Sequence, residues 1–185
     1  MIFSNVLLAA VSAMTVSALP HVQVRGTPTS SASSTPSSTS SSGGGGGSVQ
    51  IVNNLDTKVN LWSTAEGGSD KHELSSGGGS YSESFQTTAS GGISIKLSTS
   101  DSESSVLQFE YKTDGDKLYW DMSSIDLDSS SEFIKNGFTA TPSDSSCKSV
   151  SCSAGDTDCS SSYQQPDDVN TNSCSTSSSV TLTLG

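Results

Sequence analysis

Three acidic residues, Glu110, Asp121 and Asp126, are the first candidates for chemistry in this 185-residue chain. Hydrolysis of a glycosidic bond uses two carboxyl groups about 5–10 Å apart, one of which keeps its proton near neutral pH. Glu110 stands between Phe109 and Tyr111, so in a β-strand its side chain faces away from both rings. The surrounding sequence is mostly polar, which predicts ionised carboxylates that accept hydrogen bonds but have no proton to give. These acids therefore indicate binding in preference to catalysis.

Aromatic residues near expected turns are the second candidates, because aromatic faces pack against sugar rings and flat partner surfaces. Tyr119 and Trp120 are neighbours in one expected strand and point to opposite faces, so one of the two belongs to the core. Trp62 and Tyr81 stand near other turns. The predicted binding residues are, together, Trp62, Tyr81, Glu110, Trp120, Asp121 and Asp126.

Four cysteines fall within one stretch, at Cys147, Cys152, Cys159 and Cys174. An even number of cysteines in an exported chain predicts disulfides, with three possible pairings among four residues. The spacing Cys-x4-Cys-x6-Cys-x14-Cys lacks the paired Cys-x2-Cys pattern of many zinc sites. Because oxidised thiols are not nucleophiles, cysteine-based catalysis is also excluded.

The N-terminal part predicts export. An apolar run ends in the small residues Val16-Ser17-Ala18, which is typical of a signal peptide over residues 1–18. Residues 19–47 are rich in Ser, Thr, Pro and Gly and contain too little apolar surface to fold. The composition of residues 27–42 fits an O-glycosylated stalk and a bare linker equally well. One folded domain is expected over residues 48–185.

No pattern indicates a metal or a cofactor. Asp114-Gly-Asp116 resembles the start of a calcium loop, but Lys117 follows where further oxygen ligands are needed, so a hairpin turn explains the motif. Copper chelation would need His21 at the mature N-terminus together with His72, and cleavage after residue 18 does not place it there.

The charge balance excludes several partners. The chain has 19 acidic and 8 basic residues, and from Ser48 onward it contains 7 lysines and no arginine. Nucleic acids and anionic membranes need basic faces, so neither is expected as a partner. No second long apolar stretch follows the signal peptide. We therefore expect an extracellular monomer, associated with the cell wall or free.

The domain reads as all-β. Short runs of alternating apolar and polar residues are separated by Gly-rich and Asp-Gly turns, a pattern that predicts a sandwich or barrel. The expected strands are residues 49–52, 59–62, 81–85, 93–97, 106–111, 118–122, 138–141 and 180–184. Residues 143–178 consist almost entirely of Ser, Asp, Cys, Gln and Asn, which predicts an irregular lobe held by disulfides, without sheet.

Several motifs resemble a known family. Residues 49–54 and 59–62 are similar to the opening hairpin of thaumatin-like proteins. The chain resembles most the fungal Bys family, the yeast-phase-specific antigenic thaumatin-like proteins, in family order along the domain. The similar stretches are residues 61–63, 79–83, 91–96, 114–124, 142–147 and 182–184. The resemblance implies a thaumatin-like β-sandwich, secretion and a fungal origin.

Two departures from the thaumatin-like pattern stand out. Leu55 and Gly185 occupy the places where such proteins generally pair a cysteine after the first strand with one at the C-terminus. The acidic cleft of the plant relatives combines an Arg with several acids, whereas this domain has no Arg. A lysine is a poor substitute because it lacks the planar, bidentate guanidinium.

The sequence therefore predicts a secreted, non-catalytic protein of the cell wall or surface that binds a polysaccharide such as β-glucan, or a host or matrix protein. Two alternatives stay open. One is a weak β-1,3-glucan hydrolase that uses the acidic residues, and the other is a structural or antigenic surface protein without a small ligand.

Overall fold

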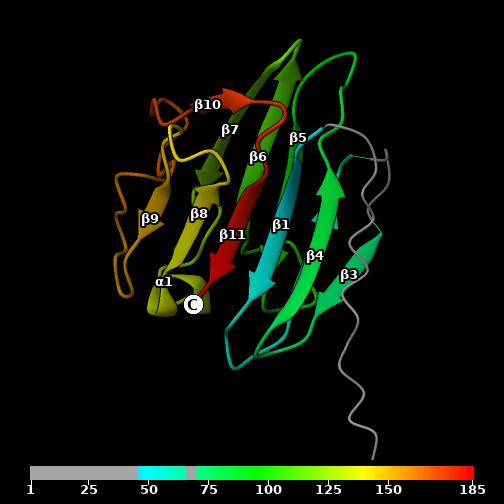
Figure 1. Cartoon of the computed structure of the whole chain (residues 1–185). Coiled ribbons are helices and arrows are strands. Elements are labelled where there is room, and N and C mark those ends of the chain that lie inside the picture. The colour runs from blue at the N-terminus through cyan, green and yellow to red at the C-terminus, as the bar shows by residue number, and fades with distance from the viewer. Residues whose placement is uncertain (1–45, 66–69) are drawn as a thin grey trace, which may run out of the picture. The chain divides into compact units, whose positions relative to one another are not determined.

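The computed structural model describes residues 46–65 and 70–185, and the structural statements below concern these residues. Two β-sheets pack face to face, with strand orders β4-β1-β11-β8-β9 and β10-β7-β6-β5-β2-β3 (Figure 1). The predicted all-β sandwich is confirmed. The predicted signal peptide and almost all of the Ser/Thr/Pro/Gly-rich segment lie outside the described residues.

The five-stranded sheet consists of β1 (Ser48–Asn53), β4 (Gly79–Ser84), β8 (Phe138–Pro142), β9 (Val150–Cys152) and β11 (Val180–Leu184). The six-stranded sheet consists of β2 (Val59–Ser63), β3 (Lys71–Leu74), β5 (Ile93–Ser98), β6 (Leu107–Asp114), β7 (Lys117–Ser123) and β10 (Asn172–Ser175). The first and last strands, β1 and β11, lie side by side and run parallel, while the other pairings are antiparallel.

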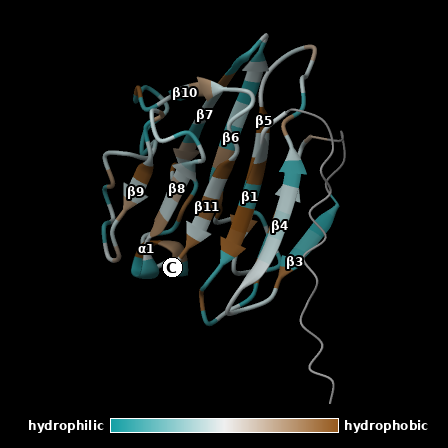
Figure 2. Ribbon diagram, viewed as in Figure 1, coloured by the Kyte–Doolittle hydropathy of each residue, from teal (hydrophilic) through white to brown (hydrophobic). Residues whose placement is uncertain are grey.

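The core forms where the alternating apolar residues of the two sheets meet. Val49 and Ile51 of β1 are fully buried, and so are the alternate residues of β11 beside them. Phe109 and Trp120 stack within the opposite sheet, with ring centroids 5.8 Å apart. Figure 2 shows hydrophobic residues on β1 and β11, whereas β4 at the sheet edge is mostly pale or hydrophilic. The alternation read from the sequence is thus the packing pattern of the sandwich.

One short helix, α1 (Glu132–Asn136), was not predicted. The Ser131 hydroxyl caps it by accepting a hydrogen bond from the Phe133 backbone N–H. Gly137 ends it with φ of 76°, and a Cβ there would lie 2.6 Å from the Cys152 carbonyl oxygen. A helix this short has no apolar periodicity to detect, which is why sequence analysis missed it.

The cysteine-rich lobe contains two disulfides, as predicted, and of the three possible pairings the structure has Cys147–Cys174 and Cys152–Cys159. The expectation of a lobe without sheet was wrong, because two strands lie within it. β9 pairs with β8 and β10 pairs with β7, each at the edge of a sheet. Cys152 and Cys174 lie in these two strands, so the disulfides tie each edge strand to the irregular part of the lobe.

Leu55 and Gly185, the two positions at which the family resemblance implies a missing cysteine pair, lie next to each other. Leu55 is buried, and the Asn54 backbone N–H donates to the Leu184 carbonyl at 2.9 Å. A Cβ on Gly185 would lie 3.0 Å from Leu55 Cδ2. Apolar packing and backbone hydrogen bonds therefore join the two positions in this chain.

Candidate functional site

Two predicted acids lie side by side on the outer face of the six-stranded sheet. Asp121 of β7 is the register partner of Glu110 on β6, and Glu110 is the register partner of Ser94 on β5. Their strand neighbours, Phe109 and Trp120, are buried in the core. Directly opposed residues in an antiparallel pair have Cβ atoms about 4.5–5.5 Å apart. The fold therefore places the two carboxyl groups within reach of one common ligand.

These acids form the floor of a cleft of about 370 Å³. Tyr119 and Lys112, opposite each other in the next outward-facing row, line it on one side, and Thr171 of the disulfide-held lobe lines it as well. Tyr119 is 37% exposed. The cleft thus offers carboxyl, hydroxyl, ammonium and aromatic groups to a ligand.

Burial changes the acidity of the pair. Burial raises the pKa of Asp121 to about 7, and the negative charge of Glu110 adds to the shift. Burial also raises the pKa of Glu110, assisted by the charge of Asp126 and opposed by a Ser94 hydrogen bond and the charge of Lys96. The raised pKa of Asp121 departs from the prediction that these acids stay ionised, because a half-buried carboxyl beside a second one resists taking a charge.

Asp126 has a different place from the other two acids. It follows β7 in a loop, where its carbonyl accepts a hydrogen bond from the Val106 N–H at 3.0 Å. It is not among the residues that line the cleft, and it acts on Glu110 through its charge alone. Asp126 is therefore a neighbour of the site.

Neither tryptophan belongs to the site, contrary to prediction. Trp120 is 1% exposed and stacks on Phe109 in the core. Trp62 is 8% exposed, although its register partner Lys96 lies on the outer face. A ring buried to this extent has no face left for a sugar. The prediction that one of Tyr119 and Trp120 is core is confirmed, and the exposed one, Tyr119, lines the cleft.

Tyr81 lies in a second cleft, of about 490 Å³, between the edge strands β3 and β4. Its hydroxyl donates to Glu83 Oε2 at 2.7 Å, and its ring lies 4.9 Å from that of His72. The other carboxylate oxygen, Glu83 Oε1, accepts from the buried Tyr111 hydroxyl at 2.9 Å. The six predicted binding residues therefore do not form one site.

Sequence reasoning missed the pairing of Glu110 with Asp121, although a signal for it was present. If the Asp114-Gly-Asp116 turn is a two-residue hairpin loop, counting outward from Asp114 and Lys117 brings these acids opposite each other, as the structure does. Thr171 had no comparable signal, since its position depends on how the lobe folds.

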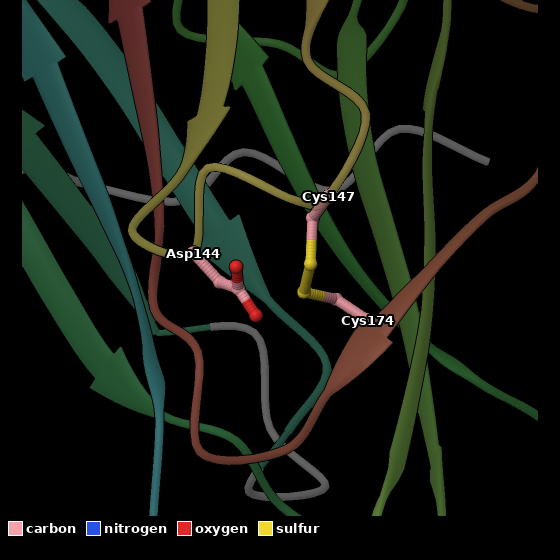
Figure 3. A group of neighbouring side chains, drawn as sticks. All are labelled: Asp144, Cys147 and Cys174. Atoms are coloured by element: carbon pink, nitrogen blue, oxygen red, sulfur yellow. A yellow bond between two sulfur atoms is a disulfide. The ribbon is translucent and has the colours of Figure 1, made fainter.

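One further group of possible metal ligands is formed by Asp144, Cys147 and Cys174 (Figure 3). Both cysteine sulfurs are bonded to each other in the disulfide. Asp144 Oδ1 accepts hydrogen bonds from the backbone N–H and hydroxyl of Ser146. Disulfide sulfur is not the thiolate that metals bind, so this group is a structural cluster.

No helix in residues 46–65 and 70–185 is long and apolar enough to cross a membrane.

The two-sheet sandwich with its disulfide-held lobe agrees with a thaumatin-like protein, a class that the names of two curated relatives also give. Among solved structures it is similar to the protein elicitor MoHrip2 from Magnaporthe oryzae, with a TM-score of 0.60 and 24% identity over 75% of this chain and 98% of that one. The chain belongs to the Bys1 family, described as Blastomyces yeast-phase-specific protein, whose family model matches residues 37–185.

Two curated relatives agree with this assignment. The chain is 44% identical to the secreted thaumatin-like protein calA of Emericella nidulans over 186 residues, covering 100% of this chain and 98% of the relative. It is 33% identical to the antigenic thaumatin-like protein of Arthroderma benhamiae over 139 residues, covering 74% of this chain and 70% of the relative. The predicted family is confirmed, and the name of the first relative supports the predicted secretion.

Proposed function

We propose that this chain is a non-catalytic extracellular protein of the cell wall or surface that binds a polysaccharide, β-1,3-glucan as the first candidate, in the acidic cleft. The observation that carries the proposal is the pair Glu110 and Asp121 on the cleft floor, with Tyr119 beside it. Carboxyl oxygens accept hydrogen bonds from sugar hydroxyls, and a phenol ring packs against the apolar face of a pyranose. A polysaccharide offers both features in every repeating unit.

The placement of the two carboxyl groups favours binding over catalysis. They project from adjacent strands on the same face of one sheet, so both approach a ligand from the same side. A glycosidase has its two carboxyl groups flanking the scissile bond, with the acid at the leaving oxygen and the other carboxylate at the anomeric carbon. Among the described residues that line the cleft, Glu110 and Asp121 are the only ones with a carboxyl group, so no third carboxyl faces them across it.

A weak β-1,3-glucan hydrolase is the second candidate, because one observation favours it. With a pKa of about 7, Asp121 keeps a proton near neutral pH, as a general acid must. In that mechanism Asp121 protonates the leaving oxygen and Glu110 serves as nucleophile or base. The geometry of the floor argues against it, and an assay of products separates the two functions.

The test measures binding and cleavage in the same samples. Purified protein is incubated with insoluble β-1,3-glucan, and both the bound protein and the new reducing ends are quantified. We expect pull-down without new reducing ends. The double variant Glu110→Ala/Asp121→Ala removes the floor acceptors and is expected to weaken binding at least about tenfold, in line with two lost hydrogen-bonding groups. Asp158→Ala, which removes an exposed carboxylate in the lobe, is the matched control.

Other outcomes point elsewhere. Reducing ends that appear with the wild type and vanish in Glu110→Gln or Asp121→Asn establish the hydrolase. If the protein neither binds nor cleaves the glucan, two functions are left: binding of a host or matrix protein, and a structural or antigenic role at the surface.

A further inference from the structure

Within residues 46–65 and 70–185, Glu110 and Asp121 form no ion pair with a lysine. The six ion pairs in this part of the chain join lysines to other acids. Lys96, whose charge acts on Glu110, holds Glu103 at 2.8 Å instead. Two neighbouring carboxyl groups without a bound cation repel each other when both are ionised.

The groups that face the pair come from three strands and two loop segments. Lys96 faces it from β5, Lys112 from β6 and Tyr119 from β7. Asp126 in the loop after β7 adds a negative charge, and the side near β10 presents the neutral Thr171. The charged groups around the pair are therefore two lysines, of which Lys96 already pairs with Glu103, and one further acid, Asp126.

We propose that pH controls binding in the cleft: the protein binds its polysaccharide while at least one of Glu110 and Asp121 is protonated, and it releases the polysaccharide when both carboxyl groups are ionised. The inference rests on the proposed function, since it concerns the regulation of the same site. A neutral ligand that covers the floor removes water from both carboxyl groups, and losing this hydration costs most when both carry charge. The bound form therefore takes up a proton from solvent whenever the free form has none.

The direction of the pH effect follows from the acidity of the pair. In the free protein Asp121 loses its proton around pH 7. Below this pH the pair already holds the proton, so the binding constant changes little. Above it each complex must take up one proton, and the dissociation constant rises by about tenfold for each pH unit.

The experiment is a titration of the full-length secreted protein with a soluble β-1,3-glucan between pH 5 and 9, at constant ionic strength, by calorimetry. We expect a constant Kd at pH 5–6 and a rise of about tenfold per unit above pH 7. Asp121→Asn removes the carboxyl whose pKa burial raises most, so this variant should keep a nearly constant Kd up to pH 9. Glu110→Gln leaves Asp121 buried and removes only the neighbouring charge, so the rise in Kd should begin at a lower pH than in the wild type. His72→Gln is the control, because His72 lines the second cleft and should not affect the profile.

The results separate this inference from the proposed function. Glucan binding with a Kd that is independent of pH in the wild type, or a pH dependence lost in His72→Gln and kept in Asp121→Asn, overturns the inference and leaves the function standing. Absence of binding at every pH overturns both. A carbon-13 NMR titration of the free protein adds a second readout: an Asp121 carboxyl that titrates near pH 4 also overturns the inference.

Discussion

Glu83 shows how one residue joins the two sheets of the sandwich. It belongs to β4 in the five-stranded sheet, and its carboxylate accepts from the hydroxyl of Tyr111 on β6 in the other sheet. Tyr111 is 2% exposed, and burial together with the Glu83 charge raises the pKa of its phenol. The phenol therefore stays neutral and donates its hydrogen bond, which makes the contact a structural one.

Removing this hydroxyl should cost stability. Tyr111→Phe leaves Glu83 with one phenol donor in place of two, and a hydrogen bond to a charged group contributes about 1.5–3 kcal/mol. We expect urea denaturation to show a loss of about 1–3 kcal/mol. In the Glu83→Gln background the same change should cost less, since the two residues are coupled. Equal costs in both backgrounds contradict the assigned hydrogen bond. Tyr163→Phe, whose hydroxyl contacts Thr171 at the surface, is the control.

Asp121 should limit stability at alkaline pH. Its folded-state pKa, about 7, lies above the unfolded value near 4. The stability that the protonated carboxyl contributes is therefore fully present below pH 4 and is lost as the pH rises through 7. Asp121→Asn resembles the protonated carboxyl at every pH. We expect the variant to have a higher Tm than the wild type at pH 8 and the same Tm at pH 3.5. A variant that is less stable than the wild type at pH 8 would show that the carboxylate is stabilised in the fold.

At the scale of strands, sequence patterns predict faces better than partners. Alternation placed Glu110 on the face opposite Phe109, and the structure agrees. The same rule is compatible with an exposed Trp62, yet the structure buries this side chain. Alternation gives the direction of a side chain and does not say what covers it. The polarity of residues 143–178 hid β9 and β10, since edge strands take Ser and Asn where one side meets solvent. Tertiary contacts decide such cases.

The disulfides should stabilise these edge strands more than the centre of the sandwich. β10 is attached to the six-stranded sheet through β7 alone, and Cys174 in it is bonded to Cys147. In Cys147→Ser/Cys174→Ser, we expect faster hydrogen exchange at the amides of β10 and of residues around Thr171, with little change in β1 and β11. The same variant should bind glucan more weakly, because Thr171 lines the cleft. Unchanged exchange in β10 would show that pairing with β7 suffices to hold it.

At the scale of the whole domain, the first and last strands meet in one sheet. β1 and β11 are adjacent and parallel, and the segment after β1 contacts the C-terminal residue. The resemblance to thaumatin-like proteins implies that Leu55 and Gly185 stand where that class generally has a cysteine pair, and the structure brings the two positions together. These contacts therefore join two segments that are separated in sequence by almost the whole domain.

A disulfide between positions 55 and 185 should stabilise the domain. Leu55→Cys/Gly185→Cys would cross-link nearly the whole folded chain, and disulfides that close long loops contribute about 2–4 kcal/mol, chiefly by restricting the unfolded state. A Cβ at position 185 would lie 3.0 Å from Leu55 Cδ2, so the two side chains meet, while the φ of 86° at Gly185 adds backbone strain that subtracts from the gain. We expect a Tm several degrees higher than that of the wild type, falling below it on reduction, because the Leu55 side chain is buried. Leu55→Cys alone should be destabilised under both conditions. A double variant that keeps two free thiols would show that the ends are not held as close as the fold places them.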